Sequence, residues 1–374
     1  MEFIFWLCVG FVFYAYIGYP GLLLLWARFR RRPVKKAYIE PMVSIIVAVH
    51  NEERIIMRKI QNLLSLDYTG DKFEIIIISD GSTDRTNKVV SEYEAKGIRF
   101  YHYEGRKGKA FALNLGISHA RGEIIFFTDA RQILERDSLR ELVANFNDSS
   151  VAVVSGELIL SVNRESRVSK DIGLYWKIEK WMRTKESQVG SVLGATGSIY
   201  AIRKNEVKPI PSQTVLDDLL IPFRAILNGH RSIFEPKARA LDEACEDIRV
   251  EFKRKIRTLS GNYQLFVLEP SLLNPLKNPI FFQFVSHKVA RLMVPFAMIV
   301  VLICSCFLSS PIYRGLLFLQ IVFYVLALSA KWGPNNFLGN LMKSFNTILM
   351  MNLAAFVGLF KFFTNPQKIQ WEKT

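Results

Sequence analysis

Several short stretches of this sequence carry acidic or basic side chains in patterns that suit chemistry on a phosphorylated substrate. Asp217 and Asp218 are adjacent acids. Neighbouring carboxylates shift each other's pKa values, which suits one of the pair to act as a general base. Asp129 follows the apolar stretch 123–128. A carboxylate at such a strand end supplies the oxygen ligand that a divalent cation needs while it bridges phosphate oxygens.

Three further sites complement these acids. Asp80, in Ile-Ser-Asp-Gly-Ser-Thr-Asp, can accept hydrogen bonds from a nucleotide base or ribose. Lys109, in Gly-Arg-Lys-Gly-Lys-Ala, begins a predicted helix, and helix N-termini favour phosphate. Arg254 and Arg257 lie three residues apart, on one face of a predicted helix. Arginine offers planar, bidentate donors that match phosphate.

Each of these patterns also has a structural interpretation that involves no ligand. The acids at strand ends can serve ordinary turns, with Asp84 as a helix N-cap. The adjacent acids can complement the N-terminus of a helix. The two arginines can belong to a basic helix end that faces a membrane. The order and surroundings of the patterns, rather than any one of them, carry the functional interpretation.

The segment from residue 42 to about residue 239 alternates predicted strands and helices. Its strands are continuously apolar and its helices are amphipathic, which is typical of a mostly parallel sheet covered on both faces. We therefore predict an α/β fold for this segment. The predicted strands are 42–49, 73–79, 98–103 and 123–128, and the predicted helices are 54–66, 84–96 and 109–120.

Polar residues follow three of these predicted strands. Asn51 and Glu52 follow the first, Asp80 ends the second, and Asp129 follows the fourth. Ligands of such sheets bind beyond the carboxyl ends of the strands. We therefore expect these four side chains to converge on one crevice.

Both ends of the chain are apolar. Residues 3–26 are long enough to cross the hydrocarbon core and are followed by a basic run, 28–36, which favours a membrane anchor with its basic end in the cytosol. Near the C-terminus, 279–289 is apolar with two basic residues and is predicted to lie in the membrane interface. Three longer apolar stretches follow and predict membrane helices at 292–308, 313–330 and 345–363.

The predicted topology contains a conflict. A cytosolic domain followed by three full crossings places the C-terminus outside. The tail nevertheless carries Lys361, Lys368 and Lys373, and lysines prefer the cytosolic side. One of the apolar stretches is therefore a candidate for a re-entrant or interfacial segment.

The net charge of the 374 residues is +15. Nucleic acid, an anionic membrane surface and an acidic substrate are the three partners that such a charge suits. Many of the basic residues flank apolar stretches, which favours contact with membrane lipids, and no nucleic-acid motif is present. The four cysteines lack metal-ligand spacing and fit a reducing or membrane setting.

Taken together, these motifs resemble the membrane-bound family 2 glycosyltransferases, the group of the cellulose, hyaluronan and poly-N-acetylglucosamine synthases. The resemblance covers about residues 42–264, and the apolar ends agree with it. The matching segments are 43–53 with its Asn-Glu turn, Asp80-Gly81-Ser82-Thr83-Asp84, Gly108-Lys109-Ala110 with Asn114, Thr128-Asp129-Ala130, Gly194-Ala195-Thr196-Gly197 with 200–203, and Asp217-Asp218.

The resemblance implies a GT-A fold, a divalent cation (Mg²⁺ or Mn²⁺) at Asp129, and inversion by direct displacement with Asp218 as base beside Asp217. It also implies nucleotide contacts from Asn51, Glu52, Asp80, Lys109, Asp129, Arg254 and Arg257. Two positions depart from the family pattern. Arg131 stands at the third position of the metal motif, and Thr258 replaces the Trp of the processive signature, which argues against a processive polymerase.

We accordingly expect a Rossmann-like GT-A domain at 40–265 between an N-terminal membrane anchor at 1–28 and C-terminal membrane helices at 291–363. An interfacial segment, 266–290, and a tail, 364–374, complete the chain. The expected partners are a nucleotide-sugar donor, with a UDP-sugar favoured, a glycan or polyprenyl-lipid acceptor, and membrane lipids. A partner subunit is a further candidate. The expected location is a bacterial plasma membrane with the catalytic domain in the cytosol. The alternative is an inactive nucleotide-binding subunit that regulates a partner.

Overall fold

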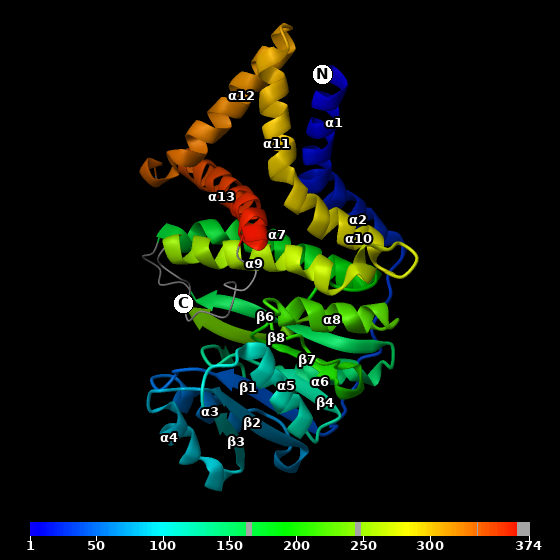
Figure 1. The fold of residues 1–374 in the computed structure, drawn as a ribbon. Coiled ribbons are helices and arrows are strands. Elements are labelled where there is room, and N and C mark those ends of the chain that lie inside the picture. Colours follow the sequence, from blue (N-terminus) through cyan, green and yellow to red (C-terminus); the bar gives the residue numbers. More distant parts are fainter. Residues whose placement is uncertain (162–166, 244–247, 335, 365–374) are drawn as a thin grey trace.

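The computed structural model describes residues 1–161, 167–243, 248–334 and 336–364. An eight-stranded sheet forms the lower half of the molecule in Figure 1, and two long helices lie across the top of it. The apolar helices extend upward from the far side of these two helices. The strands run in the order β3-β2-β1-β4-β7-β6-β8-β5. The first four strands of the sequence are therefore adjacent in space and form one half of the sheet.

This first half is parallel, as the sequence predicts. β1 pairs with β2 and β4, and β2 pairs with β3, in every case in parallel. The helix predicted at 84–96 is interrupted: α4 is followed by a separate 3-10 turn that ends at Gly97, whose φ of 89° suits glycine. The elements are β1 Val43–Val49, α3 Ile56–Leu64, β2 Phe73–Asp80, α4 Thr86–Ser91, β3 Ile98–Tyr103, α5 Lys109–His119 and β4 Ile124–Phe127.

The second half of the sheet is mixed. β4 pairs with β7 in the antiparallel sense, as do β6 with β7 and β5 with β8, whereas β6 and β8 are parallel. The sheet as a whole is thus parallel only on the side of β3, β2, β1 and β4. The elements of this half are β5 Ile133–Leu134, α6 Ser138–Val143, β6 Val151–Ser161, β7 Tyr200–Arg203, α8 Asp217–Leu227 and β8 Arg231–Glu243.

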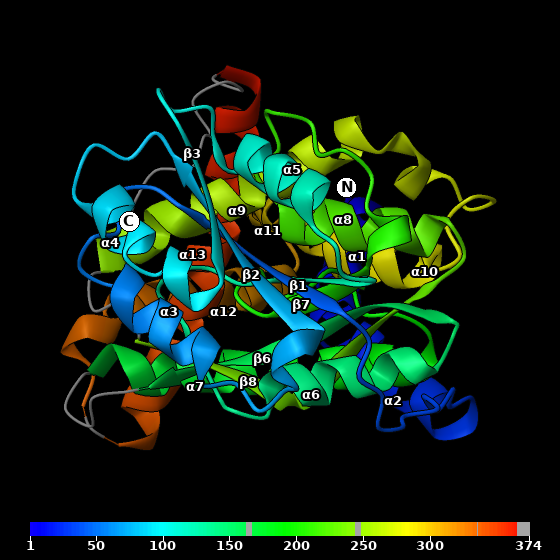
Figure 2. The same cartoon turned by 90° about the horizontal axis from the view of Figure 1, so that it is seen from below.

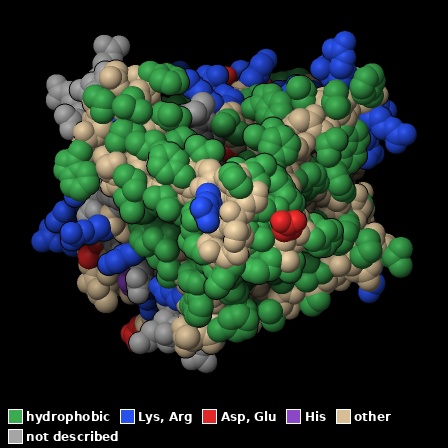
Figure 3. Space-filling model, turned by 90° about the horizontal axis from the view of Figure 1, so that it is seen from above, with side chains coloured by type: hydrophobic (Ala, Val, Ile, Leu, Met, Phe, Trp, Pro, Cys, Tyr) green, Lys and Arg blue, Asp and Glu red, His purple; other side chains and the backbone are tan. Residues whose placement is uncertain are grey.

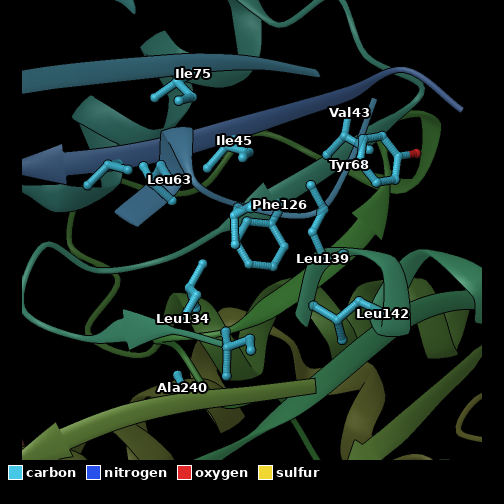
Figure 4. Packing of buried hydrophobic residues seen from close by; sticks show 14 of the residues in the cluster. Val43, Ile45, Leu63, Tyr68, Ile75, Phe126, Leu134, Leu139, Leu142 and Ala240 are labelled. Carbon is cyan, nitrogen blue, oxygen red and sulfur yellow. The ribbon is translucent and has the colours of Figure 1, made fainter. Parts of the chain in front are cut away.

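Hydrophobic side chains cover both faces of the sheet. On one face, Ile45, Phe126 and Leu139 belong to a fully buried cluster that also takes in the apolar stripe of α3 (Figure 4). On the other face, residues such as Ile46 and Tyr200 pack against α5 and α8. Continuous burial on both faces explains why these strands read as unbroken apolar runs.

Two long helices lie between the sheet and the apolar helices. They are α7 Arg167–Val189 and α9 Ile248–Leu268, and Figures 1 and 2 show both lying across the sheet. Both helices also contact the apolar helix α13. The half that contains the sheet and the apolar half therefore share a packed interface.

Within the described ranges, four helices are long and apolar enough to cross a membrane. Viewed from above Figure 1, the end of the molecule that these helices form is largely hydrophobic, and Lys and Arg side chains lie mainly around its margin (Figure 3). The segment predicted as interfacial, 279–289, differs from the expectation: Phe281–Val289 is continuous with α11 in one 27-residue helix. The four spans are Glu2–Phe29 (α1 Glu2–Phe13, a π turn Tyr14–Gly18 and α2 Tyr19–Phe29), Phe281–Phe307 (α10 Phe281–Gln283, a π turn Phe284–Val289 and α11 Ala290–Phe307), α12 Pro311–Leu328 and α13 Phe337–Thr364.

The last two of these helices return the chain toward the sheet. α12 runs back from the tip of α11 toward the sheet, and α13 then turns in a different direction and reaches α9 (Figure 1). Near the end of α13, Gly358 lies so close to the backbone of Ser260 that an added Cβ would stand 3.1 Å from its nitrogen. α12 and α13 together make one return, so the end of α13 lies on the side of the sheet, next to α9.

Buried polar contacts lock the apolar helices to α7. Tyr19, in the first span, donates a hydrogen bond of 2.9 Å to Glu186 of α7. His287, at the start of the second span, lies 2.7 Å from the same carboxylate. Arg291 in that span is 3.0 Å from Glu179 of α7. Because Glu186 is fully buried, it requires both partners, and the two spans are fixed relative to α7.

Candidate active site

Lys109 lies at the centre of the site and joins two of the predicted acids. It is the first residue of α5, and its Nζ is 3.1 Å from the Asp129 carboxylate and 3.5 Å from that of Asp217. Burial acts to lower the pKa of Lys109, but the two carboxylates raise it above its ordinary value. The structure thus brings together a strand end, a helix start and the acidic pair, although Lys109 and Asp217 are more than 100 residues apart in the sequence.

The acidic pair lies at the beginning of α8. Asp217 is buried, whereas the neighbouring Asp218 is partly exposed. Burial raises the pKa of Asp218 to about 6, and the charge of Asp217 adds to this shift. A carboxylate whose pKa lies near the working pH is well suited to take a proton from a hydroxyl group.

The segment that was predicted to lie on the acceptor side, 194–197, contacts Asp218. The backbone nitrogen of Ala195 donates a 2.8 Å hydrogen bond to the carbonyl oxygen of Asp218. A Cβ added at Gly197 would stand 3.0 Å from the Asp218 carboxylate, so a larger residue there would crowd the base. Arg183 of α7 holds the same segment through a 2.7 Å hydrogen bond to Thr196.

We expect a pH dependence that follows the raised pKa of Asp218. Protonated Asp218 has no capacity to accept the hydroxyl proton, so the turnover rate should fall by about tenfold per pH unit below pH about 6. Initial rates at saturating donor from about pH 5 to about pH 8, with thermal melting recorded at each pH, would measure it. A flat rate across this range in a folded protein would contradict the assignment.

The carboxylate of Asp80 holds a loop of the protein, a role that the sequence did not predict. It is fully buried, and its carboxylate accepts hydrogen bonds from the Tyr103 hydroxyl at 2.9 Å and from the backbone nitrogens of Lys107 and Gly108 at 2.7 and 3.0 Å. The carboxylate therefore fixes the glycine-containing loop that leads into Lys109. A contact between Asp80 and a nucleoside remains a prediction.

The turns after the first two strands are interlocked. Asn51 has a left-handed conformation with φ 55°, and its side-chain oxygen accepts a 2.8 Å hydrogen bond from the backbone of Thr83. The backbone nitrogen of Glu52 donates to Thr86 at 2.8 Å. Gly81 must be glycine, since a Cβ there would stand 2.5 Å from the backbone of Gly105. Asn51 and Glu52 thus lie beside Asp80, as predicted, and shape the same edge of the sheet.

Arg131, at the third position of the metal motif, is paired with an acid of another strand. Arg131 forms a 2.6 Å ion pair with Asp242 of β8. No three His, Cys, Asp or Glu residues in the described ranges are grouped so that they could hold a metal ion. The Asp129 side chain is 41% exposed, and Mg²⁺ needs only one or two carboxylates when substrate phosphates complete its coordination. A cation shared between Asp129 and a diphosphate therefore fits the residues present.

The two predicted phosphate-binding arginines lie on α9 and differ from each other. Arg254 is paired with Glu251 of the same helix at 2.9 Å. Arg257 shares a helix face with Gly261 and Gln264, which pack against the segment that immediately precedes Asp217. The Nε of Arg257 is buried and has no hydrogen-bond partner among the described residues. Arg257 is thus the better placed of the two to face a diphosphate.

Lys59 is a feature of the site that the sequence analysis missed. It is fully buried on α3, and its Nζ donates to the Thr128 hydroxyl at 2.7 Å and to the Gln132 carbonyl at 2.8 Å. Burial lowers the pKa of Lys59 to about 7, with the charge of Asp129 acting in the opposite direction. A sequence signal existed: the apolar stripe of this helix, at 56, 60 and 63, contains a lysine at the helical spacing of a core position.

Comparison with protein families agrees with this geometry. The family model described as glycosyl transferase family 2 matches residues 44–207. The chain is 26% identical over 239 residues to the probable glycosyltransferase YdaM of Bacillus subtilis, covering 59% of this chain and 55% of that protein. It is 25% identical over 260 residues to the beta-monoglucosyldiacylglycerol synthase of a Nostoc species, covering 67% and 55%. The chain spans about half the length of the curated relatives it matches.

A solved structure shares the whole architecture. The mannosyltransferase PcManGT from Pyrobaculum calidifontis, determined in complex with GDP-mannose and Mn²⁺, superposes with a TM-score of 0.75 and 23% sequence identity. The similarity covers 97% of this chain and 99% of that one. This similarity confirms the predicted GT-A fold, in which apolar helices precede and follow the α/β domain in the sequence.

Proposed function

We propose that the chain, whose residues 44–207 match the glycosyl transferase family 2 model, transfers a sugar from a nucleotide-sugar donor to an acceptor held at a membrane. The observation that carries the proposal is the contact of Lys109 with both Asp129 and Asp217. It gathers a cation-binding acid, a phosphate-binding lysine and the acidic pair into one site. The donor we favour is a UDP-sugar, and the GDP-mannose bound by the mannosyltransferase makes a GDP-sugar the rival to test.

The proposed reaction is a direct displacement. Asp218 takes the proton of the acceptor hydroxyl as that oxygen forms its bond to the anomeric carbon. The bond from the anomeric carbon to the diphosphate oxygen breaks at the same time, which inverts the configuration. Lys109 and Arg257 hold the departing diphosphate by charge. A bound Mg²⁺ or Mn²⁺ at Asp129 would add further neutralisation of the diphosphate.

A cavity favours a lipid-linked acceptor over a free glycan. It has a volume of about 290 Å³ and lies between α7, α9, the second span and α13. Its lining combines apolar side chains such as Leu259 and Ile348 with the basic Lys288. Lys288 also lies close enough to lower the pKa of Asp218, against the larger effect of burial. A lipid tail among the apolar helices would therefore present its polar end toward the base.

The orientation of the chain follows the same proposal. The basic residues that follow the first span favour the cytosol, where nucleotide sugars are made available to such enzymes. We place the catalytic domain on the cytosolic face of the membrane. The four candidate spans and the return of α13 to α9 support a multi-pass arrangement with both the sheet and the end of α13 on that face.

The test is donor consumption by the full chain in detergent or nanodiscs, against a panel of UDP- and GDP-sugars with and without Mn²⁺ or Mg²⁺. We expect one donor to be consumed only with the cation, and a radiolabelled product that extracts into organic solvent when membrane lipid is supplied. Nucleotide binding without turnover of any donor, with lipid present, would overturn the proposal in favour of an inactive subunit. Arg131 is the residue that motivates this alternative.

A further inference from the structure

A second cavity, of about 500 Å³, lies at the C-terminal end of α8, whereas the acidic pair begins that helix; two of the apolar helices meet the α/β domain there. Residues from the end of α2, from the segment after α7 and from the start of the second span contribute to its wall. Five basic residues line it, and no Asp or Glu belongs to its described lining. The basic residues are Arg30, Arg31, Arg32, His230 and Arg231.

Arg231 is the buried member of this group. It is 5% exposed, and its guanidinium donates to three backbone carbonyls, those of Gly190 at 3.1 Å, Ser187 at 3.1 Å and Arg32 at 2.8 Å. Burial lowers the pKa of Arg231, the charge of Arg32 lowers it further, and Asp148 offsets part of this shift. Carbonyl oxygens satisfy its hydrogen bonds but leave its charge without a contacting carboxylate, so an anion in the cavity would complete the site.

The three consecutive arginines add to this positive field. Arg31 donates to the Ala27 carbonyl at 3.0 Å. Within the described part of the chain, none of the three forms an ion pair with an acid, whereas His230 lies 3.3 Å from Glu206, which is outside the cavity. Arginine side chains in such a cluster match the oxygens of a phosphate group.

The surroundings point to a phosphate that belongs to a lipid. Arg30 directly follows α2, the last part of the first span, and Ile280 directly precedes the second span. Trp26 lines the cavity as well, and tryptophan is typical of the membrane interface. The cavity therefore lies at the level where phospholipid headgroups meet the protein, and its apolar rim continues into helices that would contact acyl chains.

From these observations we infer that the cavity is a binding site for the phosphate headgroup of an anionic phospholipid, separate from the donor and acceptor sites. The inference does not depend on the proposed transferase activity, because it concerns lipid retained by the protein. The lipid would contact Gly190 and Ser191, which begin the segment that continues to Ala195 and the backbone of Asp218. It would thereby bind next to the segment that supports the base.

The experiment uses the full chain in phosphatidylcholine nanodiscs with increasing phosphatidylglycerol, and native mass spectrometry to count the phosphatidylglycerol molecules retained. The test variant is Arg30→Gln/Arg32→Gln, which removes two exposed cavity arginines. The matched control is Arg28→Gln/Lys35→Gln, which removes the same charge from the same basic run outside the cavity lining. We expect the cavity variant to weaken the saturable binding about tenfold and the control to weaken it less than about threefold.

Two results would overturn the inference. Equal losses in the two variants would mean that the basic run attracts anionic lipid only through its overall charge. Displacement of the lipid by millimolar inorganic phosphate would mean that the cavity recognises a free phosphate and not a headgroup anchored in the bilayer. Retention of phosphatidylglycerol by the native protein, its loss in the cavity variant and its indifference to inorganic phosphate would support the assignment.

Discussion

Replacing Asp218 by Asn is expected to lower the rate of sugar transfer by about a hundredfold to ten-thousandfold, while binding of the nucleotide survives. The substitution keeps the shape of the side chain and removes its ability to accept the hydroxyl proton. Asp217 keeps its contact with Lys109, so the lysine proposed to bind the diphosphate remains in place. Rates on the preferred donor, together with nucleotide affinity by calorimetry, would measure the two effects separately.

The same variant carries an internal control. Its residual rate should no longer depend on pH around 6, because the group that titrates there is gone. Its melting temperature should not fall, since asparagine relieves the repulsion between adjacent carboxylates. Full activity in the asparagine variant would remove Asp218 as the base.

Replacing Asp129 by Asn is expected to abolish the stimulation by Mn²⁺ or Mg²⁺ and to lower the rate on the order of a hundredfold or more. Asp129 is the half-exposed carboxylate at the end of β4 and the nearer of the two acids that contact Lys109. Without it, a cation has no protein carboxylate at the diphosphate position. Rate measured against cation concentration would show the loss as a shift of the curve or as its disappearance.

A matched control for this variant is Asp71→Asn. Asp71 is exposed in the turn before the N-terminal end of β2, whereas Asp129 follows the C-terminal end of β4. The same chemical change there should leave both the rate and the cation dependence unaltered. Cation stimulation that persists in the Asp129 variant would show that the metal is held elsewhere.

The sequence predicted the parallel half of the fold because its strands are continuously apolar and buried on both faces. β3 has the predicted bounds, β1 and β2 differ from theirs by one residue at one end, and β4 is one residue shorter than predicted at each end. The strand order of the mixed half could not be predicted from the sequence pattern. β6 and β8 pair with each other although they are about 80 residues apart, and the local sequence does not indicate that pairing. The return of α13 to α9 depends likewise on distant packing.

The candidate site shows the same division. Asp129 and the acidic pair were identified from their positions after strands and before a helix, and the structure brings them together through Lys109. The partner of Arg131 was not predictable, because Asp242 lies 111 residues away. The role of Asp80 in holding the loop before Lys109 likewise became visible only from its three donors, two of which are backbone nitrogens.

The buried contacts of Glu186 have a consequence for which acceptors the enzyme can use. Tyr19 and His287, from two different spans, both contact this one carboxylate of α7. The α/β domain is thus joined to both spans through one buried carboxylate, and under the proposed function Asp218 would stand at a fixed height above the lipid surface. The proposed reaction would then favour acceptors in which the distance between the hydrophobic anchor and the hydroxyl that receives the sugar matches this height.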